Sequence, residues 1–164
     1  MSDLTPLRGI VLFAGLSDAQ LGGIAAVVRR REARAGATIF REGEPGDSLF
    51  ILARGSVDTT KRFGLLSSEA AARQKVLVQL TAPQFFGEMV LLEDAERSAT
   101  VTAATDCVLY ELARAEFARL VEADLELGYR VARNIAAAVS ARLRHSDQDI
   151  LKLTAALSLA LGNR

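Results

Sequence analysis

The chain has 164 residues, half of them apolar, so it can bury one sizeable core, and we expect a single domain over residues 1–164. Its 20 basic and 20 acidic residues cancel, which removes the bulk attraction behind nonspecific nucleic-acid binding and disfavours direct DNA binding. The lone Cys107 excludes an internal disulfide, and no secretion signal is recognisable, which favours a cytoplasmic protein. No apolar run is long enough to span a bilayer, so we expect no membrane association.

Residues 18–28 are predicted to form a short amphipathic helix, because their apolar residues recur at helical spacing. Ser17 stands directly before them, where its hydroxyl can accept a hydrogen bond from the first free amides of a helix. We therefore expect residues 1–30 to form an N-terminal helical part.

Residues 31–113 change to brief apolar runs separated by turn residues, which indicates short antiparallel strands. The clearest runs are residues 38–40, 48–52, 76–80, 99–103 and 108–112. Pro45 followed by Gly46 suits the two central positions of a type II turn. The polar residues 61–74 are predicted to extend a hairpin as an exposed loop. The predicted fold class is α+β: an antiparallel β-roll of the jelly-roll type, flanked by N-terminal and C-terminal helices.

Residues 114–164 return to helical spacing, and apolar residues three and four apart predict a long helix over residues 125–144. Ser146 and Asp147 are typical N-cap residues and predict that a further helix follows. Its apolar face, within residues 150–161, is too extensive to be solvated all round. Self-association and docking within the chain are both open explanations for this face.

One continuous segment carries the strongest sign of a binding site. Residues 86–101 read FGEMVLLEDAERSATV, in which Gly87 and Glu88 precede Arg97. A glycine lets the backbone approach a ligand closely, and an arginine meets phosphate oxygens with a fixed fork of donors. A carboxylate repels phosphate but accepts hydrogen bonds from hydroxyl groups, as acidic residues do with a ribose. The segment therefore predicts a sugar-phosphate ligand, with a nucleotide as the first candidate.

These segments together resemble the cyclic nucleotide-binding domain family, which includes catabolite-activator-like regulators, kinase regulatory subunits and cyclic-nucleotide-gated channels. The resemblance covers residues 13–143 and rests on FAGLSDAQL, GATIFREGEPGDSLFILARGSV, the segment at residues 86–101 and TDCVLYELARAEFARLV. It implies a non-enzymatic sensor of cyclic AMP or cyclic GMP, with cyclic AMP favoured. It also implies a relay through the C-terminal helices to a protein effector, without a DNA-binding, kinase or channel module in this sequence.

The resemblance assigns roles within residues 86–101, which we call the phosphate cassette. Arg97 is expected to pair with the cyclic phosphate, and Glu88 to accept a hydrogen bond from the ribose 2′-hydroxyl. Gly87 is expected to offer its backbone to the sugar. Ser98 and Ala99 are expected to bond the phosphate through a hydroxyl or an amide.

Two further parts of the site follow from the resemblance. Met89 and Val90 complete the ligand-binding stretch, although the family usually has alanine or glycine where this chain has Val90. A branched side chain there either crowds the ligand or points into the core. A residue of the long C-terminal helix often caps the base, and by position this is Arg144 or Ser146.

Three functions compete on these grounds. Besides the sensor, rolls of this shape house metal-dependent enzymes, but such sites need several histidines and this chain has only His145, which we expect to be solvated. We therefore expect no catalytic residue and no metal. The third candidate, supported by Val90, is a degenerate pocket that survives as an interaction or dimerisation domain.

Glu88 also has a structural alternative, in which it only anchors Arg97. Finally, the spacing over residues 125–139 permits a helix-to-helix seam, and we expect a homodimer.

Overall fold

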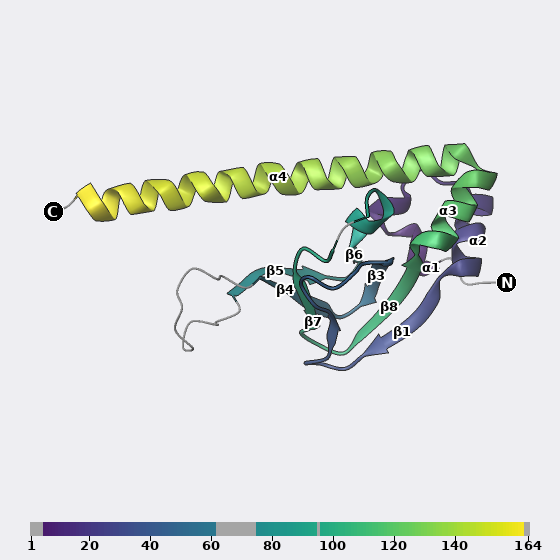
Figure 1. Cartoon of the computed structure of the whole chain (residues 1–164), viewed down its shortest axis with the longest axis horizontal. Coiled ribbons are helices and arrows are strands. Elements are labelled where there is room, and N and C mark those ends of the chain that lie inside the picture. Colours follow the sequence, from purple (N-terminus) through teal and green to yellow (C-terminus); the bar gives the residue numbers. More distant parts are fainter. Residues whose placement is uncertain (1–4, 62–74, 95, 163–164) are drawn as a thin grey trace.

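Two four-stranded antiparallel sheets form a roll, with short helices gathered at one end and a long helix lying over it (Figure 1). The computed structural model describes residues 5–61, 75–94 and 96–162, so the loop predicted at residues 61–74 lies almost entirely outside the described residues. One sheet has the strand order β1-β8-β3-β6 and the other β2-β7-β4-β5. The strands are β1 (Arg29–Ala33), β2 (Thr38–Phe40), β3 (Ser48–Arg54), β4 (Ser56–Lys61), β5 (Lys75–Thr81), β6 (Gln84–Phe86), β7 (Thr100–Ala103) and β8 (Cys107–Ala113). The predicted fold class, a β-roll flanked by helices, is confirmed.

Among the described residues, the helical segments precede and follow the roll, apart from one short turn of 3-10 helix inside the phosphate cassette. They are α1 (Thr5–Arg8), the 3-10 helix η1 (Val11–Phe13), α2 (Asp18–Val27), the 3-10 helix η3 (Glu88–Leu91), α3 (Arg114–Ala123) and α4 (Leu125–Gly162). The predicted cap of α2 is present, because the Ser17 hydroxyl accepts from the Gln20 amide at 3.2 Å. The Gln20 side chain in turn accepts from the Ser17 amide at 2.9 Å, which completes a capping box.

The five predicted strands correspond to β2, β3, β5, β7 and β8, and their ends agree to within two residues. β1, β4 and β6 were not predicted. β1 reads RRREA, a sequence with little strand propensity, yet it pairs in register with β8 from Arg29 opposite Glu111 to Ala33 opposite Cys107. It lies at the edge of its sheet and its arginines are exposed, so charged side chains are tolerated there.

The predicted type II turn at Pro45 and Gly46 is wrong, because the turn occurs three residues earlier. The amide of Glu44 donates to the carbonyl of Arg41 at 3.2 Å, and Gly43 has a φ of 83°, as the third residue of a type II turn requires. Pro45 instead forms an isolated antiparallel bridge with Glu96. The segment that follows the turn therefore lies against the end of the cassette.

The two C-terminal helices predicted around a break at residues 145–147 are one continuous helix, α4, of 38 residues. Ser146 and Asp147 lie inside it, where their exposed side chains leave the backbone ladder intact. Their cap-forming chemistry was misleading because no glycine or proline follows to break the helix until Gly162. Figure 1 shows α4 passing over the roll and projecting beyond it, with the C-terminus at its far end. None of the described helices is long and apolar enough to cross a membrane.

The first half of α4 is packed into the core, and this packing fixes its direction over the roll. Leu127, Val131 and Ile135 belong to the hydrophobic cluster that joins the helices to the outer face of β3 and β8. The buried Asn134 amide donates to the carbonyl of Leu12 at 2.9 Å and to that of Ala14 at 3.0 Å. A second cluster, which includes β3 and β7 residues, fills the space between the sheets.

Asp124 caps the start of α4 and makes the stability of the folded protein sensitive to acid. Its carboxylate accepts from the Gln20 side chain at 2.9 Å and from the Leu127 amide at 3.0 Å. The bond from Gln20 and then that from Leu127 lower the pKa of Asp124 below its ordinary value of 3.8. Because the pKa is lower in the folded state, this carboxylate stabilises the fold above about pH 4 and the contribution disappears as the pH falls through the folded pKa.

We expect Asp124→Asn to remove this part of the acid sensitivity. In urea titrations at about pH 6 and about pH 3, the difference in unfolding free energy between wild type and variant should shrink at the lower pH. Other carboxylates titrate alike in both proteins and cancel in the difference. A difference that stays constant with pH would contradict the assignment.

Candidate functional site

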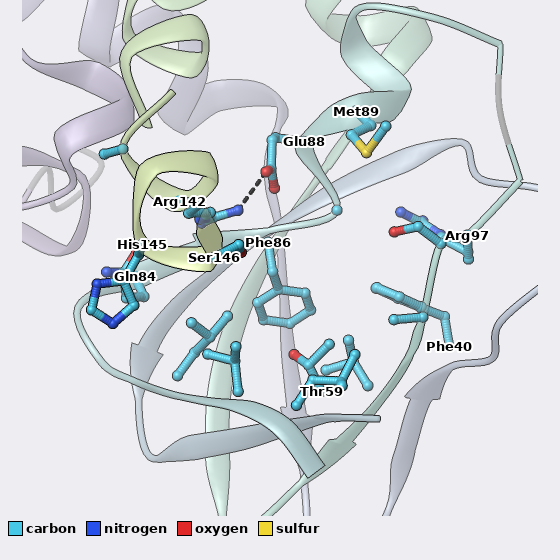
Figure 2. A pocket seen from close by; sticks show the side chains of 18 of the residues that line it. Phe40, Thr59, Gln84, Phe86, Glu88, Met89, Arg97, Arg142, His145 and Ser146 are labelled. Atoms are coloured by element: carbon cyan, nitrogen blue, oxygen red, sulfur yellow. Dashed lines mark hydrogen bonds and ion pairs between the residues drawn. The ribbon is translucent and has the colours of Figure 1, made fainter. Parts of the chain in front are cut away.

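A cavity of about 750 Å³ lies between the phosphate cassette, the roll and α4 (Figure 2). Its size is within the range of small-molecule sites. The cassette residues predicted from the sequence all line it: Gly87, Glu88, Met89, Val90, Arg97, Ser98 and Ala99. Phe40, Phe86 and β5 residues supply apolar surface, and α4 closes one side. The cavity thus brings together a cation, a carboxylate and an apolar wall.

Gly87 is required at its position for two independent reasons. Its φ of 73° is left-handed, where a side chain is strained, and this conformation turns the chain from β6 into η3. A Cβ atom there would also lie 2.7 Å from Nη1 of Arg97. The glycine therefore lets the arginine approach the backbone closely.

Arg97 is a buried cation whose hydrogen-bonding capacity is not fully used. Only 6% of the residue is exposed, and none of the ion pairs among the described residues includes it. Its guanidinium lies over the Phe40 ring, 4.2 Å from the centroid, and Nη1 has no hydrogen-bond partner within the described structure. Burial lowers the pKa of Arg97, and the carboxylates of Asp47, Glu111 and Glu44 oppose this shift from a distance. A buried donor without an acceptor is costly unless a ligand supplies one.

Glu88 is also buried, with 5% of the residue exposed, and its partner comes from α4 rather than from the cassette. Arg142 donates from Nη1 to Oε1 of Glu88 at 2.5 Å and from Nη2 to the carbonyl of Phe85 at 3.0 Å. The alternative in which Glu88 anchors Arg97 is therefore wrong. Figure 2 shows Arg142 and Arg97 on opposite sides of the cavity, with Phe86 between them.

Arg142 lines the cavity and binds Glu88, and the sequence did not lead us to predict it. It follows Val131, Ile135 and Ala138 at spacings of four, three and four, so it continues the face of α4 that packs on the chain's own core. That continuation was the available signal. It was overlooked because the predicted helix break lay close to residue 142 and left the phase of the helix open.

Val90 departs from the usual small residue, and the structure accounts for its bulk. Only 2% of it is exposed, and a Cβ atom on Gly46 would lie 2.4 Å from Cγ1 of Val90. The side chain therefore occupies the space that the missing side chain of Gly46 leaves free. The same added Cβ would lie 3.2 Å from Nε of Arg97, so Gly46 also limits the room around the cation.

The two base-capping candidates are placed differently. Ser146 lines the cavity, whereas Arg144 does not and donates instead to the Ser140 hydroxyl at 2.8 Å within α4. His145, expected to be solvated, is exposed and also lines the cavity. No group of three or more His, Cys, Asp or Glu side chains suited to a metal ion occurs in the described part of the chain.

A profile of the family named "Cyclic nucleotide-binding domain" matches residues 30–124, which contain the cassette and all of the roll except Arg29. The chain belongs to the cyclic nucleotide-binding domain family. It is 32% identical to the cyclic AMP receptor protein of Thermus thermophilus over 144 residues, which are 88% of this chain and 62% of that protein.

Solved structures of this family share the fold. The crystal structure of the Thermus thermophilus catabolite activator protein matches with a TM-score of 0.72 and 31% identity, over 88% of this chain and 63% of that one. The regulatory domain of Toxoplasma gondii PKA, solved with cAMP, matches with a TM-score of 0.63 and 28% identity, over 71% of this chain and 42% of that one. This chain therefore spans less than two thirds of each of these relatives.

Proposed function

We propose that the chain is a non-enzymatic sensor, formed as one cyclic nucleotide-binding domain, that binds cyclic AMP or cyclic GMP between the cassette and α4. The observation that carries the proposal is Arg97, a buried cation without an ion pair in the described structure, with one donor unused and with its side chain against the cavity. A cyclic phosphate supplies the missing acceptor and counter-charge. Hydrogen bonds between charged groups of this kind are about twice as strong as neutral ones.

The distribution of groups around the cavity supports one orientation of the ligand. The phosphate lies at Arg97 with Ser98 and Ala99 beside it, and the sugar hydroxyl lies at Glu88. The base then extends towards α4, where Ser146 is a candidate cap. Arg144 and the preference for cyclic AMP remain predictions.

The proposed relay runs through α4 to a protein effector. α4 contributes Arg142, His145 and Ser146 to the cavity, so a bound base contacts the helix directly. A ligand can shift the helix only by as much as its affinity differs between the two helix positions. Binding without any change in α4 would contradict the relay and leave the binding site itself intact.

Isothermal titration calorimetry on the native chain tests the proposed ligand. We expect heat with cyclic AMP or cyclic GMP and weaker binding of the open-chain 5′-AMP, which serves as the matched control. If neither cyclic nucleotide produces heat, the alternative is favoured, in which the fold acts as a ligand-free interaction or dimerisation domain.

We also propose that the exposed side of α4 pairs with the same helix of a second copy. Residues there follow one another at alternating spacings of four and three, as in the a and d positions of a coiled coil. They are Tyr129, Ala132, Ala136, Val139, Leu143, Ser146, Ile150, Leu153, Leu157 and Ala160. Of the seam predicted over residues 125–139, Gly128 and Ile135 are buried within the chain instead, because they face α3 and the N-terminal helices.

The apolar side chains on this surface favour burial against a second copy over exposure to water. Leu143, Ile150, Leu153 and Leu157 are each 59–69% exposed, and the last turns of α4 project beyond the roll (Figure 1). A helix without packing against another element is marginally stable in water. Parallel two-fold pairing would place each apolar layer against its own copy along the whole seam.

Light scattering checks the pairing through the mass in solution. We expect twice the 17.6 kDa chain mass for wild type and a shift towards monomer for Leu157→Glu, which places a charge in the seam. Ala155→Glu is the matched control, because it adds the same charge on the opposite side of the helix. A monomer mass for wild type at working concentration would contradict the pairing.

A further inference from the structure

The guanidinium of Arg97 is enclosed by an aromatic ring and by two glycine backbones. It lies over the Phe40 ring, with 4.2 Å between Cζ and the ring centroid. A Cβ atom added to Gly46 would lie 3.2 Å from Nε, and one added to Gly87 would lie 2.7 Å from Nη1. Both backbones therefore approach the group closely, and together with the ring they leave it little freedom to rotate.

The ring and the cation are also held together through the backbone. Phe40 is the last residue of β2, and the turn that follows it is bonded to Arg97 in both directions. The Arg97 amide donates to the carbonyl of Glu44 at 2.8 Å, and its carbonyl accepts from the amide of Gly43 at 2.9 Å. The Phe40 ring in turn packs against the ring of Phe50, with 5.8 Å between the centroids. The contact between ring and cation is thus built into the fold and does not depend on a ligand.

An aromatic ring attracts a cation without using the cation's hydrogen-bond donors. The negative face of the ring acts on the guanidinium as a whole, whereas a carboxylate binds its N–H groups directly. Arg97 takes part in none of the ion pairs among the described residues, and its Nη1 has no hydrogen-bond partner there. A phosphate that enters the cavity therefore displaces no carboxylate from this cation.

We infer that Phe40 is a positioning residue, whose ring holds the Arg97 guanidinium in place at the cavity and leaves its N–H donors to an anionic group of the ligand. The inference rests on the proposed function and names the residue that prepares its phosphate site. Both side chains line the cavity, and Figure 2 shows them next to each other. Because Phe40 acts through Arg97, its effect on affinity must disappear when Arg97 is removed.

A double-mutant cycle tests this dependence by calorimetry on the full chain with cyclic AMP and cyclic GMP. Phe40→Leu keeps an apolar side chain but removes the ring, and we expect it to weaken binding about tenfold. In the Arg97→Ala background the same substitution should change the affinity less than about twofold. An equal loss in both backgrounds would overturn the inference and indicate that Phe40 is only part of the apolar wall.

Phe86→Leu is the matched control for this cycle. Phe86 also lines the cavity, but its ring stacks on Phe50, with 5.5 Å between the centroids, and makes no cation contact with Arg97 in the described structure. Any loss of affinity that it causes should be the same with and without Arg97.

Replacing Phe40 by pentafluorophenylalanine separates the charge distribution of the ring from its shape. The fluorinated ring fills nearly the same space, but its face no longer attracts a cation. We expect a loss of affinity close to that of Phe40→Leu. Affinity equal to that of wild type would overturn the inference, even if Phe40→Leu binds weakly because its fold is disturbed.

Nuclear magnetic resonance of the ligand-free chain follows the contact itself. The ring current of Phe40 should shift the Hε resonance of Arg97 upfield in wild type, and Phe40→Leu should abolish this shift. An Hε resonance that does not change in Phe40→Leu would overturn the inference. If wild type binds neither cyclic nucleotide, the sensor proposal falls, and this spectrum still decides whether Phe40 holds Arg97.

Discussion

Arg97→Ala is expected to weaken binding of cyclic nucleotide by about 100-fold or more. The substitution removes the only cation among the cassette residues that line the cavity, and with it an unused donor. Loss of two hydrogen bonds to a charged phosphate at about 1.5–3 kcal/mol each is enough for this factor. Calorimetry on wild type and variant, with the cyclic nucleotide that wild type binds better, measures it.

Two further variants separate the contribution of the paired donors of the Arg97 guanidinium to binding from the contribution of its charge. Arg97→Lys keeps the charge and loses the fixed pair of donors, so we expect an intermediate loss of about tenfold. Arg133→Ala removes an exposed arginine from α4 outside the cavity and should bind as wild type does. Arg97→Ala should also unfold at nearly the same urea concentration as wild type, because removing a buried unpaired cation offsets the lost contact with Phe40. Undiminished binding by Arg97→Ala would contradict the assigned site.

Gly46→Ala is expected to lower the unfolding free energy by about 2 kcal/mol, because the new methyl group meets Cγ1 of Val90 at 2.4 Å. For a chain of this length, such a loss lowers the Tm by roughly 4–8 °C. The methyl group also lies 3.2 Å from Nε of Arg97, so ligand affinity should fall as well. Thermal unfolding followed by circular dichroism measures the first effect.

The double variant Gly46→Ala with Val90→Ala decides whether this clash is the cause. Removing the valine methyl groups makes room for the new one, so the two substitutions together should cost less than the sum of their separate effects, by about 1–2 kcal/mol. Strict additivity would contradict the proposed fit between the two residues. Gly22→Ala serves as the control, since nothing lies within 4 Å of the added atom in α2, and it should stabilise the chain by about 0.5–1 kcal/mol.

The parts of the site that lie next to one another in the sequence were the parts that could be predicted. Gly87, Glu88 and Arg97 share one cassette, and a single turn of 3-10 helix is enough to bring them to one cavity. Arg142 lies 54 residues from Glu88, and its role depends on how a helix crosses the roll. No local sequence pattern shows how α4 crosses the roll.

The same division applies to the fold. Strands with apolar runs were found to within two residues, whereas β1 was missed because its pairing with β8 outweighs the poor strand propensity of three arginines. The break predicted near Ser146 failed because cap-forming residues are also tolerated on the exposed side of a helix. The fit of Val90 to Gly46 joins residues 44 positions apart, and only packing shows it.

Because α4 is continuous, a small tilt of the helix produces a large displacement of its C-terminal end. The helix is held to the core up to Ala138 and to the roll at Arg142, and from there it runs unbroken to Gly162. Twenty helical residues at 1.5 Å each make an arm of about 30 Å. A tilt of about 10° at Arg142 would therefore move the tip by about 5 Å, close to one turn of helix. A rearrangement of the ion pair between Glu88 and Arg142 would therefore move the far end of α4. The displacement would be large enough for a neighbouring protein to detect.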